Sequence, residues 1–172
     1  SGNNLSLDGL QGLGGYRRLV LVGVSDISAL SNATASEGVD IEIRGTSLIN
    51  LIGLEGVVSA QSIFIRDNGS LTSLDGLENL ELVRDLLRVE YNPVLESMAG
   101  LTALVRINGS FWLNANDQLP SVDGLERLEF IGGERFRLEY NDRISNLDGL
   151  SGLKEIKGLV RLNQNIGLVN VN

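Results

Sequence analysis

Three aligned stretches decide the fold: LTSLDGLENLELVRDLLRVEYNPV (71–94), LESMAGLTALVRINGSFWLNANDQ (95–118) and LPSVDGLERLEFIGGERFRLEYNDR (119–143). A fourth stretch, ISNLDGLSGLKEIKGLVRLNQNIG (144–167), has the same pattern. The leading apolar residues of successive repeats are 23 to 25 residues apart, at Leu48, Leu71, Leu95, Leu119, Ile144 and Leu168. Self-similarity at a fixed period of this length indicates a repeat architecture.

Each repeat contains a short segment in which apolar residues alternate, as in Ile63-Phe64-Ile65 and Phe111-Trp112-Leu113. This alternation predicts a brief strand whose first and third side chains point inward. The Asp-Gly-Leu turn and the Leu-x-x-Leu that follows it predict a turn into a second short extended side. A unit this short cannot bury its own apolar face, so successive units must stack. The sequence therefore predicts an all-β parallel β-solenoid of about seven coils with a repeat of about 24 residues.

The repeats cover nearly all of the 172 residues without a linker, which predicts one solenoid domain over 1–172. Residues 48–172 form regular coils, and residues 1–47 are degenerate coils. The segment 31–38, Ser-Asn-Ala-Thr-Ala-Ser-Glu-Gly, lacks the Asp-Gly-Leu turn. We expect this segment to be a loop in the least ordered coil.

One asparagine recurs in register in five repeats, three residues before the next leading apolar residue. These residues are Asn68, Asn92, Asn116, Asn141 and Asn165. An inward polar side chain must be satisfied by hydrogen bonds, and an amide supplies both donors and an acceptor. We expect a structural asparagine ladder that fails in the early repeats, where Val24 occupies the corresponding position.

The repeated Ser-Leu-Asp-Gly-Leu, the apolar pairs and the in-register asparagines resemble the receptor L-domain family, which is related to leucine-rich repeats. The resemblance covers 48–172 well and 1–47 loosely. The resemblance implies a right-handed β-solenoid and a binding function at a cell surface or outside the cell. Metazoan receptor L-domains usually carry disulfides, whereas this chain has no Cys, so the cysteine-free microbial or protist surface proteins are the better match.

The composition excludes several kinds of chemistry. Without Cys or His, the chain has no disulfide, no thiolate nucleophile, no histidine-based triad and no imidazole metal ligand. A net charge of −8 disfavours binding to nucleic acid or to anionic membranes. No apolar run approaches the roughly 20 residues of a membrane span, so we expect no membrane insertion by this segment. We expect no cofactor and no metal site.

The outward positions of the strands carry the candidate binding residues. A first column contains Phe64, Arg88, Trp112, Arg137 and Arg161, and a second column two residues further on contains Arg66, Asn114 and Glu139. Stacked coils would bring these side chains together on one face, with neighbours about 4.8 Å apart. Trp and Arg often dominate binding energy. We therefore expect this face to bind an unknown protein or glycan ligand.

Other sites are less well supported by the pattern. The Asp-Gly pairs do not follow the short period of calcium-binding β-rolls, and we expect their aspartates to accept turn N–H groups while the glycine takes a positive φ. Thr residues do not line up as in an ice-binding face. Glu90 and Glu139 lie two coils apart, next to arginines, which does not distinguish a glycosidase pair from a solvated surface. The glycosylation sequons at Asn32, Asn68 and Asn108 carry no weight, because Asn68 belongs to the ladder.

These observations predict a non-enzymatic ligand-binding or adhesion module of a cell-surface or secreted protein. A structural spacer of the cell surface or wall without a specific ligand is the alternative, and a polysaccharide-active enzyme is a third. Neither Ser1–Leu10 nor Leu168–Asn172 resembles the polar cap that solenoids need. Such ends predict further coils or caps, or an oligomer formed through the ends.

The absence of metal-ligand patterns yields a first test. Addition of EDTA should leave the melting temperature unchanged, because the fold should not depend on bound calcium. Thermal unfolding followed by circular dichroism measures this. A fall of several degrees that calcium reverses would show that Asp123 and Asp148 bind metal.

Overall fold

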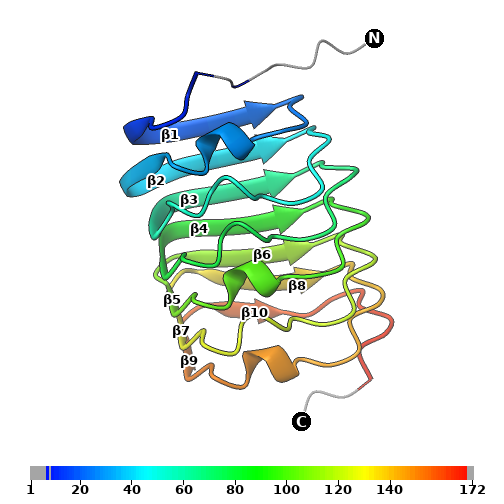
Figure 1. Cartoon of the computed structure of the whole chain (residues 1–172). Coiled ribbons are helices and arrows are strands. Elements are labelled where there is room, and N and C mark those ends of the chain that lie inside the picture. Colours follow the sequence, from blue (N-terminus) through cyan, green and yellow to red (C-terminus); the bar gives the residue numbers. More distant parts are fainter. Residues whose placement is uncertain (1–6, 8, 170–172) are drawn as a thin grey trace.

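The structure is a computed structural model that describes residues 7 and 9–169, and over these residues the chain winds into a stack of coils (Figure 1). The strands are β1 (Gly14–Val22), β2 (Thr34–Arg44), β3 (Ser59–Arg66), β4 (Leu82–Glu90), β5 (Arg106–Ile107), β6 (Ser110–Asn114), β7 (Phe130–Ile131), β8 (Arg135–Glu139), β9 (Glu155–Ile156) and β10 (Leu159–Arg161). Three short 3-10 turns are η1 (Ser28–Leu30), η2 (Ala99–Leu101) and η3 (Asp148–Leu150). The predicted all-β parallel β-solenoid is confirmed, with about six turns.

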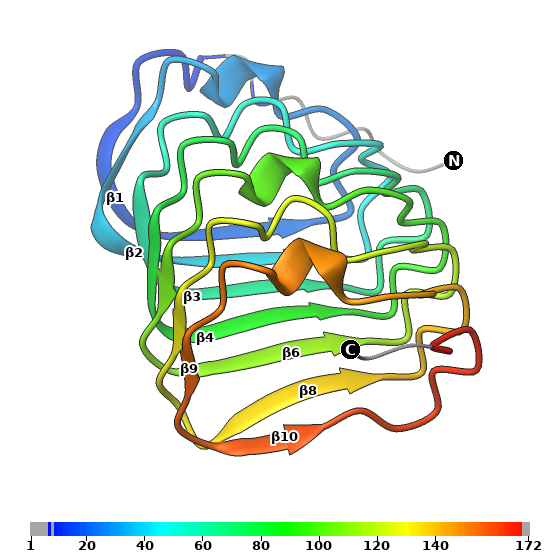
Figure 2. The same ribbon diagram turned by 90° about the horizontal axis from the view of Figure 1, so that it is seen from below.

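Two parallel ladders form the walls of the solenoid. The main ladder runs through β1, β2, β3, β4, β6, β8 and β10. The start of β4 also pairs with β5, and β5, β7 and β9 continue this second, shorter ladder. Figure 2 shows the main strands along one side and the η turns on the opposite side, with β9 of the short ladder at the connecting edge. The predicted second extended side is this short ladder.

The core consists of inward columns of aliphatic side chains. Ile63 and Ile65 of β3 are fully buried, as the alternation predicted. Phe111 of β6 is also fully buried, and its ring stacks on Phe136 of β8 with centroids 5.5 Å apart. Burial of a large apolar side chain contributes about 1.5–3 kcal/mol, and each column repeats that contribution in successive coils.

A glycine marks the corner between the short ladder and the main ladder in each of three successive coils, at Gly109, Gly133 and Gly158. A Cβ at Gly109 would lie 1.6 Å from the carbonyl oxygen of Asp85, and one at Gly133 would lie 2.2 Å from the carbonyl carbon of Gly109. Backbone from the neighbouring coil therefore occupies the space of a side chain. This contact explains the glycine that recurs in the repeat.

The asparagine ladder lies at the opposite end of the main strands. Asn92 accepts hydrogen bonds at Oδ1 from the backbone N–H and the side-chain amide of Asn68, at 3.2 and 3.1 Å. Its own Nδ2 donates to the carbonyl oxygen of Ile65 at 3.2 Å. Each asparagine thus satisfies backbone of the coil before it. Asn68, Asn92, Asn116 and Asn141 are fully buried, which also places the Asn68 sequon out of reach.

The residue before each ladder asparagine adopts a left-handed conformation, which was not predicted. These non-glycine residues have φ between 53° and 58°, and they are Asp67, Tyr91, Ala115, Tyr140 and Gln164. In the first two coils Gly23 and Gly45 take the same conformation. Thr46 then ends the ladder, because its N–H and hydroxyl both donate to Asn68 Oδ1.

The expectation of a loop at 31–38 was wrong. β2 begins at Thr34 and pairs with β1, with Thr34 opposite Gly14 and Ala35 opposite Tyr16. The coil turns just before this segment, at η1, and buries Leu30 completely. Ser28-Ala29-Leu30 thus replaces Asp-Gly-Leu at the same corner, with Leu30 N–H donating to Ile27 as Leu77 N–H donates to Leu74. Pairing to β1 then holds the following residues extended.

The Asp-Gly-Leu turns differ from the expectation in one respect. Gly76 and Gly124 have the predicted positive φ, at 114° and 103°. Their N–H groups donate to the carboxylates of Glu78 and Glu126, at 2.8 and 3.0 Å, and not to the preceding aspartates. The glutamate two residues after the glycine can reach back over the turn, and so it takes the role that we had given to aspartate.

The ladder geometry predicts an asymmetry between two asparagines. Asn116→Ala should lower the free energy of unfolding by about 1–3 kcal/mol, because it leaves buried turn groups of the preceding coil unsatisfied. Asn163→Ala should cost less than about 0.5 kcal/mol, since Asn163 is exposed. Urea unfolding measures both changes, and equal losses would contradict the assigned roles.

Candidate functional site

The register of the main ladder places all eight predicted binding residues on one face. Phe64, Arg88, Trp112, Arg137 and Arg161 are successive cross-strand partners in the first column. In the second column Arg66 is opposite Glu90, Glu90 is opposite Asn114, and Asn114 is opposite Glu139. Inward neighbours such as Leu113 are buried, so these columns lie on the outer surface.

Trp112 lies between two arginines at the centre of this face. The guanidinium carbons of Arg88 and Arg137 are each 4.9 Å from the centroid of the indole ring. Strands pair at about 4.8 Å, which is close to the separation for a cation–π contact. Because one arginine comes from the coil before and the other from the coil after, both faces of the indole are covered.

The second column alternates carboxylates and amides. Glu90 is only 3% exposed, and its carboxylate accepts from Asn114 Nδ2 at 2.6 Å and from Arg88 Nε. Glu139 accepts from Asn163 Nδ2 at 3.1 Å. This column covers the outside of the sheet with side chains that hold one another in place.

Three buried polar atoms have no hydrogen-bond partner among the residues that the structure describes: Trp112 Nε1, Asn114 Oδ1 and Arg137 Nε. Trp112 and Asn114 point to the same side of β6, and Arg137 is the partner of Trp112 on β8. Only 9% of the surface of Asn114 is exposed. A buried polar group left unpaired costs about 1–3 kcal/mol, so their gathering at one place marks it as distinct from the rest of the sheet.

Phe64 and Arg66 lie in the N-terminal half of the face, away from the tryptophan. Phe64 is the column neighbour of Arg88. Arg66 pairs with Asp67 at 3.4 Å and lies 3.8 Å from Glu42. The structure therefore brings together Arg88, Trp112 and Arg137. The charge of Arg66 is instead neutralised by the carboxylates of Asp67 and Glu42.

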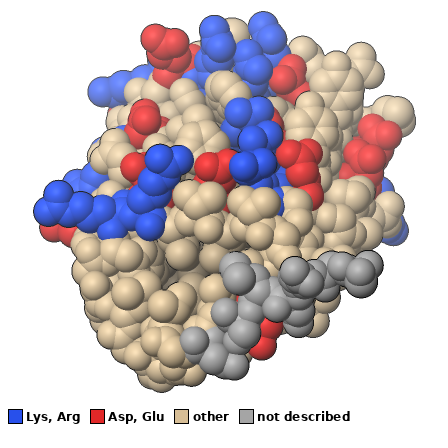
Figure 3. Space-filling view, turned by 90° about the horizontal axis from the view of Figure 1, so that it is seen from above, with Lys and Arg blue, Asp and Glu red and all other residues tan. Residues whose placement is uncertain are grey.

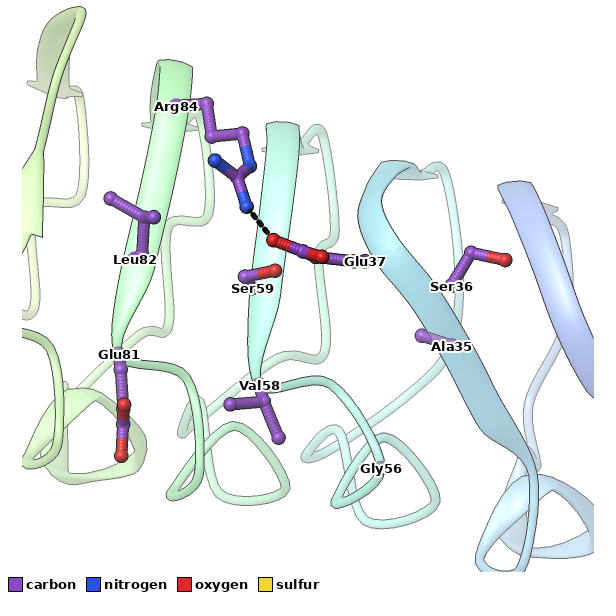
Figure 4. A pocket seen from close by; sticks show the side chains of 9 residues that line it. All are labelled: Ala35, Ser36, Glu37, Gly56, Val58, Ser59, Glu81, Leu82 and Arg84. Carbon is purple, nitrogen blue, oxygen red and sulfur yellow. Dashed lines mark hydrogen bonds and ion pairs between the residues drawn. The ribbon is translucent and has the colours of Figure 1, made fainter.

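A cleft of about 400 Å³ was not predicted from the sequence (Figure 4). It forms where the first half of β2 turns away from β3, and the ladder between them begins only at Val39 and Ala60. Ser59 accepts a hydrogen bond from the Gly38 N–H at 3.3 Å, and Arg84 forms an ion pair with Glu37 across β3. The only signal in the sequence was the irregularity of 31–38.

A second cation–aromatic stack lies on the short ladder. Phe130 of β7 has Arg106 4.2 Å from its ring centroid and the Lys157 ammonium at 5.4 Å. These residues were not predicted from the sequence. They repeat the packing of Trp112 on a different side of the solenoid and so provide matched controls for experiments on the main face.

Charge is distributed unevenly over the surface. Viewed from the N-terminal end, Lys, Arg, Asp and Glu intermingle on part of the surface while a broad area has no charged side chains (Figure 3).

A hydrogen bond from Lys154 lowers the pKa of Glu129, and burial raises the pKa of Tyr16. Within the described part of the chain, no group of three or more Asp or Glu residues could hold a metal ion. No helix there is long and apolar enough to cross a membrane.

Comparisons of the chain with protein-family models, with curated proteins and with solved structures find no match. The geometry of the coils and of their surfaces is therefore the basis for any functional assignment.

The stacking of Trp112 can be measured directly, because it is the only tryptophan in the chain. Arg137→Ala should raise quenching of its fluorescence by acrylamide roughly twofold, since one of two covered ring faces is opened. Arg106→Ala removes the equivalent contact from Phe130 and should change the quenching little. Equal quenching in all three proteins would contradict the arrangement around the indole.

Proposed function

We propose that the chain is a non-enzymatic ligand-binding or adhesion module that binds through the outward face of the main sheet around Trp112. The observation that carries the proposal is the cluster of three unpartnered buried polar atoms beside the only tryptophan. Tryptophan and arginine are enriched among residues that dominate binding energy at interfaces. The protein covers these atoms, so a ligand that shifts the side chains above them and pairs with them would recover the cost of burying them.

We also propose an L-domain-like module at the surface of a cell or in a secreted protein. The repeat of about 24 residues and the stacked solenoid with its asparagine ladder support this proposal. The ladder asparagines are fully buried and hydrogen-bonded from coil to coil. The lack of Cys favours the cysteine-free relatives of that family.

The state of the outward carboxylates supports a binding role over an enzymatic one. A glycosidase needs one carboxyl that donates a proton and one that is free to attack or to activate water. Glu90 is held by Asn114 and Arg88, and Glu139 is held by Asn163. Both carboxylates therefore hold the surface together.

A structural spacer is the second candidate, and one observation favours it. In β10 the side chains of Leu159 and Val160 are 54% and 45% exposed. An open apolar strand of this kind can pair with another coil or with a second copy of the chain. In a spacer, association would occur at this edge and would not depend on Trp112.

The proposal is tested by array screening of the purified domain on glycan and protein arrays. Trp112→Ala should abolish binding to a hit and lower the free energy of unfolding by less than about 3 kcal/mol, since the indole lies outside the core. The matched control is Phe130→Ala, which removes an aromatic ring from between two cations on another side and should preserve binding. Loss of binding in both variants, or in neither, would contradict the proposed site.

A further inference from the structure

We infer that the ligand of this face is an acidic segment of a partner protein, and that it places a carboxylate on Arg137. This inference rests on the proposed function, because it concerns the same surface. It specifies the chemistry of the ligand, which the proposed function leaves open.

The inference begins from two equivalent arginine–glutamate pairs. Arg88 and Glu90 are two residues apart on β4, and Arg137 and Glu139 have the same spacing on β8. Arg88 forms an ion pair with Glu90. Glu139 accepts from Asn163 of the next coil, as Glu90 does from Asn114, but the arginine that pairs with Glu139 is Arg161, at 4.0 Å. Arg137 is therefore left without the carboxylate that its counterpart has.

The guanidinium of Arg137 makes no hydrogen bond or ion pair among the described residues, and its Nε is completely covered. A partly buried guanidinium without an anion is unfavourable, because it loses water without gaining a charged partner. Carboxylates pair with guanidinium groups through two parallel hydrogen bonds, which is among the strongest polar contacts in proteins. Glu90 accepts from Nε of Arg88, whereas a ligand carboxylate would accept from the two Nη groups of Arg137, because its Nε is covered.

The surroundings of Arg137 favour an anionic ligand. Arg135 precedes it by two residues on the same face of β8, and Arg161 is its partner on β10. Both side chains are exposed. Of these arginines, only Arg161 is paired with a described carboxylate, that of Glu139. At the other end of the face, by contrast, a single carboxylate, Glu42, lies within 3.8 Å of three arginines. The charges near Arg137 are therefore positive on a chain whose net charge is −8.

A protein segment fits this surface better than an acidic glycan. Sugars are commonly bound by stacking on an open aromatic face, and both faces of Trp112 are covered by guanidinium groups. Arginine and tryptophan on a sheet surface are typical of protein interfaces.

The experiment measures binding of a fluorescein-labelled polyglutamate peptide by anisotropy. The peptide should bind, and added salt should weaken the complex. Arg137→Gln should weaken binding about tenfold, which corresponds to the loss of a charge-assisted hydrogen bond. Arg106→Gln has the same change in charge and also removes a guanidinium from an aromatic ring, but on another side, so it should bind within about twofold of the unchanged protein. Arg161→Gln, an exposed position, is the second variant if Arg137→Gln does not fold.

Several outcomes would overturn the inference. These are no binding of polyglutamate, equal losses in Arg137→Gln and Arg106→Gln, or a preference for polygalacturonate, which would identify an acidic glycan instead. A ligand from the arrays whose binding needs Trp112 but is unaffected by Arg137→Gln would overturn the inference and leave the proposed function intact. If no ligand depends on Trp112, the proposed function fails as well.

Discussion

The structure depends on one side-chain amide in each of five successive coils, from Asn68 to Asn165. A ladder asparagine donates to a main-strand carbonyl of the preceding coil and accepts from the preceding asparagine, as Asn116 does with Val89 and Asn92. These bonds hold a corner where five non-glycine residues adopt the left-handed conformation, which costs each about 1–2 kcal/mol. Because the corner is fixed in each of these coils, every following strand starts in the same register. The aliphatic core and the outward columns both follow from that register.

The fixed register also determines which side chains are neighbours on the outward face. Equivalent positions of successive coils are direct neighbours, so like charges are brought within contact distance unless other residues separate them. Trp112 separates Arg88 from Arg137 in the first column, and Asn114 separates Glu90 from Glu139 in the second. Groups therefore alternate from β4 to β8, whereas Arg137 and Arg161 are direct neighbours between β8 and β10. Among the three arginines of the first column, Arg88 and Arg161 form ion pairs with described carboxylates, and Arg137 does not.

Much of this arrangement could be predicted from the sequence, because a solenoid repeats one set of local contacts. The period, the inward strand residues and the ladder asparagines all follow from residues such as Ile63, Phe111 and Asn116. Two features depend on contacts between coils that have no sequence pattern. The strand at Thr34 is held by β1, and the cleft beside Ser59 forms where β2 leaves β3. The ion-pair partner of Glu139 could not be predicted either, because arginines occur both on its own strand, at Arg137, and in the next coil, at Arg161, which is the one that pairs with it.

The asparagine ladder has a direction along the chain. Asn92 accepts from Asn68 and donates to Ile65 of the coil that ends at Asn68. Asn68 likewise accepts from Thr46 and donates to Ile43 of the coil before it. On the ribosome, a coil that has just emerged therefore lacks the bonds for its own corner. At about 5–20 residues per second, the next repeat of about 24 residues takes roughly one to five seconds to appear. During that time the newest coil is an open edge, and translation speed sets how long it is exposed to other chains.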